Sequence, residues 1–577
     1  MKRFGNYLEA VALALLAGLL WGARELFWQM MDWADGPELW MKRGGVIRNV
    51  LAAYSAFFAA GACASWYAAR RRATTLIGIG VGAIRSSAGE TRSLFRWFYR
   101  AAQIENSALW LVAITAIGAV LRAYFLARPM AYDESNTFLS YVNNGFLYLF
   151  LYREPNNHVL HTLLVKLSVG LFGGHPVAIR LPAYLASVLA IPMAFGLSKL
   201  LFDGKASGLL ASAAVALSPY LVLYGTNARG YSLVVLFSLC LAVLAIRMVD
   251  RPTTGLCFPA ALLVALGLWV TPSFLFPATG LLCWASAALL KDRRPLWLAT
   301  RIWAPCLATT AGLAAVFYTP TVIATMGLRA VVDNPFVRAE PWREFWAGLP
   351  AHLAKTANQF ASGIPTAFLC AVAFLFVVGL CIQIKRGNWR AFALLPIVLI
   401  GSMALLVSKH NVPYPRVWIF LVPFILFVAD AGLAAILNCA GARVKTWMLL
   451  GAGGCAVCLM SRDVVAVEDD VFPEVPALVK VLAGEMRPGD ELIVPMPADV
   501  PVAFYMWHEG VPRTPPPSGG DESRKRYFIA LPRSYPISRL TRNPVRQIVR
   551  IDDAELYVEC METDEAIVPR GGISGHE

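Results

Sequence analysis

Apolar stretches of about 20 residues recur along most of this 577-residue chain, and an α-helix of that length crosses a lipid bilayer. Hydrophobic residues make up 58% of the sequence and charged residues 15%, whereas soluble domains carry about 25% charged residues. Inside a bilayer each backbone polar group must bond within the protein, which favours helices for such stretches. We therefore predict an α-helical polytopic membrane protein.

The flanks of the apolar stretches indicate about thirteen transmembrane helices. We place them near residues 8–27, 47–69, 108–126, 178–200, 206–224, 230–248, 256–271, 273–290, 302–320, 360–383, 391–407, 416–437 and 446–461. Basic clusters such as Lys2–Arg3, Arg70–Arg72 and Lys385–Arg390 fall in loops of one parity. The positive-inside rule makes that parity cytoplasmic, so we expect a cytoplasmic N-terminus.

The formal charge of +14, from 51 Lys and Arg against 37 Asp and Glu, has the same explanation. Membrane proteins concentrate basic residues in cytoplasmic loops, where these side chains also meet anionic lipid head groups. The sequence contains no nucleic-acid-binding motif. We expect the lipid bilayer, and no nucleic acid, to be the partner of these charges.

The composition divides the chain into three predicted segments. Residues 1–107 hold two additional N-terminal spans and a basic cytoplasmic loop, residues 108–461 form the transmembrane core, and residues 462–577 resemble soluble protein in composition. Within the last segment, strand patterns occur at 491–495, 527–531, 547–551 and 555–559, and helical patterns at 476–485 and 500–509. We predict a small exoplasmic α/β domain there.

The loop 127–177 is too long for a simple connection and holds two amphipathic stretches, near 136–146 and 160–172. We predict that both are helices lying in the membrane interface. If the second stretch spanned the bilayer, every later basic cluster would fall outside the cell.

Two adjacent carboxylates, Asp133 and Glu134, follow the exoplasmic end of the third span. Together with the imidazoles of the same loop, carboxylates at this position suit proton transfer or a divalent metal. The alternative is structural, because acidic residues also cap helix N-termini and interact favourably with the helix dipole.

The same loop contains Glu154, Asn157, His158 and His161, and Arg180 begins the fourth span. Carboxylates and imidazoles together suit proton transfer or a divalent metal, for which Glu154, His158 and His161 are the candidate ligands. A histidine at the start of a helix can equally be a hydrogen-bonding cap. The spacing does not fix a complete set of metal ligands.

Two exoplasmic junctions present cations to the face where Asp133 is expected. Arg229 and Tyr231 lie between the fifth and sixth spans, and Lys409 and Arg416 lie between the eleventh and twelfth. Each cation alone is consistent with a side chain that extends to the interface. Together they could bind the phosphate of a membrane lipid.

These pieces resemble the GT-C class of integral-membrane glycosyltransferases. The resemblance is to the branch of protein O-mannosyltransferases, lipid A aminoarabinose transferases and rhizobial lipopolysaccharide galacturonosyltransferases, and it covers roughly residues 108–440. It rests on Asp133–Glu134, Asn157–Leu164, Leu171–Gly173, Arg180–Ala183 and Ala228–Tyr231.

The resemblance implies a sugar donor carried on a polyprenyl phosphate, with Asp133 as general base. The acceptor would be a hydroxyl of a glycolipid, a cell-envelope glycan or a protein. No cofactor is required, although the resemblance leaves a divalent metal open. The expected location is the bacterial inner membrane, with the C-terminal domain in the periplasm. His158 is followed by Val159, where relatives often have proline.

Two other functions fit parts of the sequence. Asp430, a carboxylate inside the twelfth span, would suit a lipid or sugar transporter or flippase. A ligase that uses a diphosphate-linked oligosaccharide would have the same exoplasmic residues, so only identification of the donor separates it from the transferase.

Overall fold

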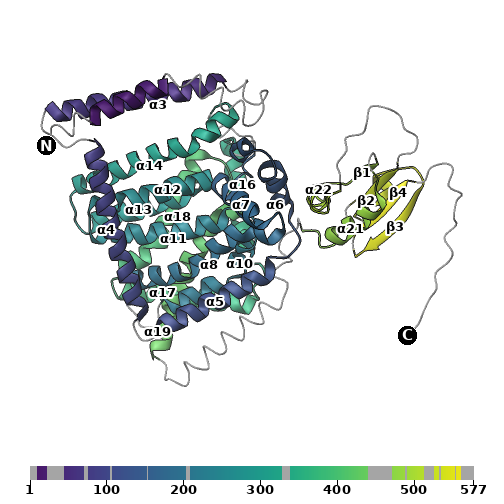
Figure 1. Ribbon diagram of the computed structural model, residues 1–577. Coiled ribbons are helices and arrows are strands. Elements are labelled where there is room, and N and C mark those ends of the chain that lie inside the picture. Colours follow the sequence, from purple (N-terminus) through teal and green to yellow (C-terminus); the bar gives the residue numbers. More distant parts are fainter. Residues whose placement is uncertain are drawn as a thin grey trace. The chain divides into compact units, whose positions relative to one another are not determined.

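The computed structural model describes residues 9–21, 44–70, 76–103, 107–152, 154–202, 208–327, 338–439, 471–487, 490–511, 525–531, 535–552 and 554–559. The chain divides into two compact units (Figure 1). Unit 1 comprises Met1–Leu126, Ser140–Gly173 and Val177–Val467, and unit 2 comprises Ala127–Leu139, Gly174–Pro176 and Glu468–Glu577. The boundaries predicted from composition at 107 and 461 remain predictions.

Unit 1 is a helical membrane bundle. Among the described residues, nine helices are long and apolar enough to cross a bilayer. They comprise α3 (Gly44–Arg70), α5 (Ser107–Phe125), α8 (Pro176–Leu201), α11 (Tyr231–Asp250), α13 (Leu275–Lys291) with a preceding turn, α14 (Leu296–Thr325), α17 (Thr366–Lys385), α18 (Trp389–Lys409) and α19 (Leu421–Cys439) with the turn at Pro415–Phe420. The central helix is α11, since 78% of its most apolar window is buried, against 11% for α14 and α17.

The polytopic helical fold predicted from hydropathy is confirmed. Three predicted spans correspond to shorter apolar or broken helices, which are residues 9–21, α12 (Cys257–Val270) and the pair α9 (Leu209–Leu217) and α10 (Pro219–Gly225). The predicted span at 446–461 lies outside the described residues. In the loop 140–173, the second amphipathic stretch is the helix α7 (Val159–Phe172).

The break between α9 and α10 has a direct cause in the sequence. Pro219 has no backbone N–H, so it cannot donate to the carbonyl of Val215 one helical turn earlier. The guanidinium of Arg122, fully buried on α5, replaces the missing donors. Its Nη2 donates to Val215 O at 3.1 Å, and its Nη1 donates to Ala216 O at 2.8 Å. Its Nε donates to Ser187 Oγ at 2.6 Å.

Helices α17 and α19 approach each other at two glycines. A Cβ atom added at Gly379 would collide with the carbonyl oxygen of Val428, and one added at Gly432 would collide with that of Leu375. Small residues permit such close backbone contact between membrane helices, where dispersion forces replace the hydrophobic effect.

Two helices of unit 1 are absent from the sequence prediction, and one of them is α16 (Trp342–Ala361), which lies between two predicted spans. The basic segment expected to be a cytoplasmic loop contains the 28-residue amphipathic helix α4 (Leu76–Gln103). Figure 1 shows α4 crossing the ends of α11, α12 and α13 rather than running parallel to them. Its charged residues hide the helix from a hydropathy scan, which detects only stretches that are apolar on all sides.

Unit 2 contains a four-stranded sheet and two helices. The strands β1 (Glu491–Ile493), β2 (Arg526–Ala530), β3 (Val545–Ile551) and β4 (Ala554–Glu559) have the order β1-β2-β4-β3. Strand β1 is parallel to β2, while β4 is antiparallel to β2 and β3. The helices are α21 (Val475–Glu485) and α22 (Asp499–His508). All four predicted strands and both predicted helices are thus confirmed within a few residues.

Candidate functional site

The two adjacent carboxylates differ in environment. They lie in the first turn of the short helix α6 (Tyr132–Thr137), in unit 2. Glu134 is fully buried, and its Oε2 accepts the backbone N–H of Ala131 at 3.0 Å. This bond is the glutamate half of a capping box, so Glu134 fixes the start of the helix. Asp133 is only half-buried, which leaves it the more accessible carboxylate.

The segment with Asp133 packs against the C-terminal part of unit 2. The Tyr505 hydroxyl on α22 accepts the backbone N–H of Met130 at 3.0 Å. The ring of Phe138 lies 5.3 Å from that of Phe504 and 4.6 Å from that of Trp507, measured between centroids. Helix α22 therefore positions the turn that carries Asp133, a contact across more than 370 residues that no local pattern predicts.

In unit 1, three of the sequence-predicted residues surround the aromatic ring of a fourth, Tyr231. The guanidinium carbons of Arg229 and Arg416 lie 5.6 and 5.9 Å from the ring centroid of Tyr231. The His158 ring is 4.9 Å from the same ring, almost perpendicular to it. We call these residues, His158, Arg229, Tyr231 and Arg416, the Tyr231 cluster. It joins the loop before α7, the start of α11 and the turn before α19.

The cluster holds positive charge in a largely dehydrated place. Arg229 is 3% exposed and Tyr231 is 5% exposed. Two further rings extend the aromatic wall, because Tyr224 lies 5.1 Å from Tyr231, and Tyr414 lies 4.8 Å from the guanidinium carbon of Arg416. Sequence reasoning missed Tyr224 and Tyr414 as site residues, although both stand inside the two junctions that it singled out.

His158 is held as a hydrogen-bond acceptor. Its Nδ1 accepts the backbone N–H of Gly230 at 2.8 Å, so the ring is not protonated at that atom. Burial lowers the pKa of His158 well below 6.5, and the charges of Arg229, His161 and Arg416 lower it further. A Cβ at position 230 would lie 2.6 Å from Nδ1, so glycine is required for this contact.

The lowered pKa gives a testable pH dependence. Below about pH 6.5 the unfolded chain takes up a proton at His158 that the folded protein excludes, so folding stability falls as the solution is acidified. In His158→Gln, which cannot be protonated, the unfolding temperature should fall less between about pH 7.5 and pH 5 than in the parent.

The exposed His175 provides the control for this measurement. The variant His175→Gln should keep the pH dependence of the parent. An identical pH dependence in His158→Gln and the parent would contradict the assignment of His158 as a buried neutral ring.

The other predicted residues of unit 1 differ in their burial and in their hydrogen-bond partners. Asn157 is buried and donates to the carbonyls of Leu149 and Leu151 at 3.0 and 2.7 Å, which fixes the loop. Arg180 is buried and donates to Leu126 O at 2.9 Å. His161 is fully buried, whereas Glu154 and Lys409 are exposed. Lys409 is the last residue of α18.

Glu154, His158 and His161 are the candidate metal ligands predicted from the sequence. Across the described ranges, the structure contains no group of three or more His, Cys, Asp or Glu side chains arranged to hold a metal ion. His158 already uses Nδ1 as an acceptor for the Gly230 N–H. The residues that are brought together, two guanidiniums with aromatic rings, suit an anion rather than a cation.

Comparison with known proteins gives one family match and two similar folds. The family described as dolichyl-phosphate-mannose-protein mannosyltransferase matches residues 156–323, which include His158, Arg229 and Tyr231. A search of curated protein sequences finds no match.

Two solved structures share the fold. ArnT from Cupriavidus metallidurans in the apo state has a TM-score of 0.51 and 14% identity, over 79% of this chain and 98% of that chain. ArnT bound to undecaprenyl phosphate has a TM-score of 0.50 and 13% identity, over 79% and 99%. The chain is therefore a multi-pass helical membrane protein that shares the fold of these two structures, and its residues 156–323 match the mannosyltransferase family model.

Proposed function

We propose that the protein is an inverting glycosyltransferase that moves a sugar from a polyprenyl-phosphate donor to a hydroxyl acceptor at the exoplasmic face. The observation that supports this most is the convergence of Arg229 and Arg416 on Tyr231, of which Arg229 and Tyr231 lie in the segment matched by the mannosyltransferase family. Preorganised guanidiniums in a dehydrated site stabilise a phosphate that gains charge as it leaves. Undecaprenyl phosphate, bound in the ArnT structure, is a lipid of this chemistry.

In this proposal Asp133 acts as general base. The acceptor hydroxyl gives its proton to the Asp133 carboxylate while its oxygen bonds to the anomeric carbon of the sugar. The bond from that carbon to the phosphate oxygen breaks on the opposite face, so the configuration inverts. The electron pair leaves with the polyprenyl phosphate, which the Tyr231 cluster would stabilise. Each step uses only side chains of this protein, and a divalent metal has no assigned role.

Glu134 supports Asp133 rather than sharing its chemistry, since its carboxylate is occupied in the helix cap. The acceptor would be a glycolipid, a cell-envelope glycan or a protein. The basic loops favour a cytoplasmic N-terminus, and with it a C-terminal domain in the periplasm of a bacterial inner membrane.

A transporter or flippase based on Asp430 receives less support. The Asp430 carboxylate is 4% exposed and accepts the hydroxyl of Ser198 at 3.1 Å, which gives this intramembrane acid a local structural partner. The hydrogen bond to Ser198 accounts for a buried carboxylate at this position without a role in transport.

The direct test is mass spectrometry of lipid-linked sugars in cells that lack the protein. We expect one polyprenyl-monophosphate sugar to accumulate and to disappear on complementation with the parent, but not with Asp133→Asn. Accumulation of a diphosphate-linked oligosaccharide would instead indicate the ligase. An unchanged pool of both lipids would refute both transferase proposals.

A further inference from the structure

A second, strongly basic site lies in unit 1 at the far end of α11. A cavity of about 360 Å³ opens between α4, the last turn of α11 and the turn Thr254–Leu256. Its polar lining consists mainly of the four guanidiniums of Arg96, Arg100, Arg247 and Arg251, with the single carboxylate of Glu90. Four positive charges against one negative charge leave an excess of three within one pocket.

A further acid, Asp250, interacts electrostatically with Arg247 and offsets part of this excess. Asp250 is the last residue of α11, and its carboxylate also accepts Arg390 Nη1 at 2.6 Å. Arg390 also bonds Asp292, so these three residues form their own exposed ion-pair network. Even with Asp250 counted, the pocket therefore keeps an excess of two positive charges for a ligand.

Arg247 is the most constrained of the four. Its guanidinium carbon lies 4.3 Å from the centroid of the Trp97 ring on α4, which holds the group in place. Its Nε and Nη2 atoms are buried and have no hydrogen-bond partner among the described residues. Buried donors that lack a partner are costly, so their presence beside a cavity points to an acceptor that binds there.

The wall formed by α4 is fixed to the bundle. Ser87 Oγ donates to Gly255 O at 2.6 Å, and a Cβ at Gly255 would lie 2.7 Å from Ser86 Oγ. The Phe98 ring packs edge-on against Phe195 of α8 at 6.0 Å. These contacts hold the arginines of α4 opposite those of α11 before any ligand arrives.

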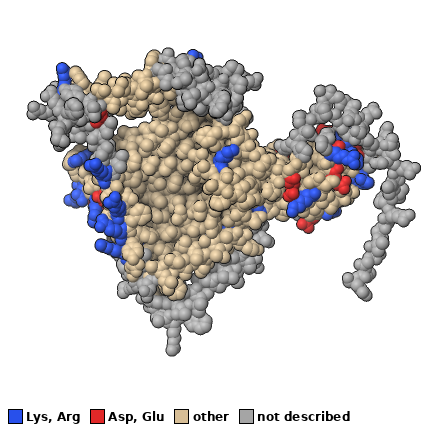
Figure 2. Space-filling view, viewed as in Figure 1, with Lys and Arg blue, Asp and Glu red and all other residues tan. Residues whose placement is uncertain are grey.

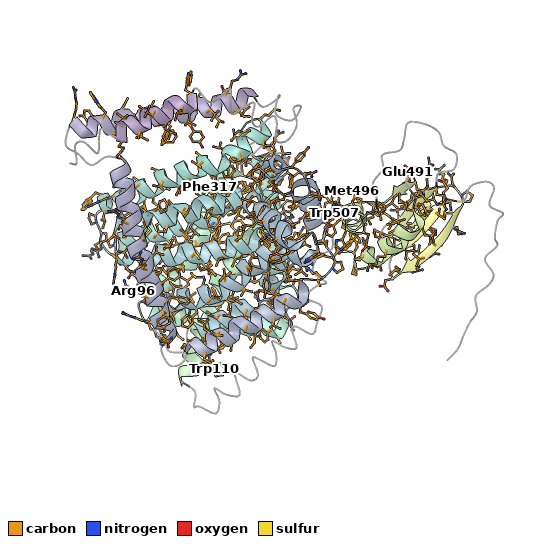
Figure 3. The ribbon with its side chains drawn as sticks, in the orientation of Figure 1. Arg96, Trp110, Phe317, Glu491, Met496 and Trp507 are labelled. Carbon is orange, nitrogen blue, oxygen red and sulfur yellow. The ribbon has the colours of Figure 1, made fainter. Side chains whose placement is uncertain are left out.

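The cavity and the Tyr231 cluster occupy opposite ends of one helix. Tyr231 begins α11 and Arg247 lies in its last turn, and 20 residues at about 1.5 Å each span about 30 Å, the thickness of a hydrocarbon core. Beside the cavity, Phe95 and Tyr99 on α4 are 71% and 66% exposed, as suits a helix in the lipid interface. Figure 2 shows Lys and Arg side chains gathered along the flank that α4 occupies, and Figure 3 labels Arg96 there.

We propose that this cavity binds the phosphate of a glycerophosphate group, carried by an anionic phospholipid of the membrane leaflet opposite the Tyr231 cluster. Arginine pairs with phosphate through two parallel hydrogen bonds, and basic pockets between membrane helices suit anionic lipid head groups. The volume accommodates a head group. The site is separate from the proposed sugar-transfer chemistry and does not depend on it.

The test measures binding to purified full-length protein in a neutral detergent. The probes are dioctanoyl phosphatidylglycerol, the zwitterionic dioctanoyl phosphatidylcholine and the soluble sn-glycerol 3-phosphate. Neutralising two guanidiniums in Arg96→Gln/Arg251→Gln should weaken phosphatidylglycerol binding about 30-fold. The matched control Arg85→Gln/Arg92→Gln removes two exposed charges of α4 that do not line the cavity, and should bind like the parent.

The outcomes separate the sources of the phosphate. Loss of phosphatidylglycerol binding confined to the cavity variant supports the lipid site, and the same loss for glycerol 3-phosphate alone supports a soluble phosphate compound. Equal phosphatidylglycerol binding by parent, variant and control overturns the proposal, as does equally tight binding of phosphatidylcholine. If the double variant unfolds, Arg100→Gln tests the same cavity, with an expected loss of about fivefold.

Discussion

Asp133→Asn should lower the rate of sugar transfer about 100- to 10,000-fold while leaving donor binding intact. An amide cannot take the proton of the acceptor hydroxyl, but it has nearly the volume of the carboxylate. The donor phosphate would still meet the guanidiniums of Arg229 and Arg416. The measurement compares single-turnover transfer with equilibrium binding of a polyprenyl-phosphate sugar by the purified protein.

Glu134→Gln is the matched control, because a glutamine oxygen can accept the Ala131 N–H in place of the carboxylate. We expect this variant to keep transfer within a fewfold of the parent. An equal loss in Glu134→Gln and Asp133→Asn would show that the pair acts together. Full activity in Asp133→Asn would remove this residue from the mechanism.

The second large effect concerns stability. Arg122→Met should lower the free energy of unfolding by about 3 kcal/mol, because the carbonyls of Val215 and Ala216 lose their donors inside the bundle. Methionine has a similar length and adds no charge, so the loss reports on the hydrogen bonds. The measurement is the thermal unfolding transition in detergent.

Arg301→Met is the control for this variant. Arg301 is an exposed basic residue near the start of α14, so its replacement should shift the transition little. Equal transitions in Arg122→Met and Arg301→Met would contradict the role of the guanidinium at the break between α9 and α10.

Much of this fold follows from periodicity. Long apolar stretches predict the membrane helices, because in lipid every backbone N–H and C=O group must be hydrogen-bonded within the protein, and a helix achieves this within one segment. Short strand-like runs likewise predict β2 and β4, and the confirmed helices α21 and α22 have apolar residues at helical spacing. These features depend on residues that are close together in the sequence.

The unpredicted features depend on distant residues or on breaks within apolar sequence. The apolar stretch 206–224 looks continuous, yet Pro219 divides it, and only Arg122 on another helix makes the break tolerable. Spacing alone could not distinguish Asp133 from Glu134, whereas burial does. The packing of Phe138 on α22 likewise cannot be predicted from local sequence patterns, because the two segments are far apart in the sequence.

For the candidate site, the motifs identified His158, Arg229, Tyr231 and Arg416 as residues of one face. They could not show that three of these side chains surround the ring of the fourth. That arrangement depends on Gly230, whose missing side chain lets the His158 ring reach the backbone.

The dependence of α9 on Arg122 also constrains biosynthesis. Arg122 is synthesised more than 90 residues before Val215 and Ala216, whose carbonyl oxygens accept its hydrogen bonds. An arginine raises the free energy with which a lone helix enters the bilayer, by about 2.5–3.5 kcal/mol at the helix centre and by less in the last turn, where Arg122 lies. We therefore expect α5 to remain beside the insertion machinery until α9 emerges, so that the two helices enter the lipid as a pair.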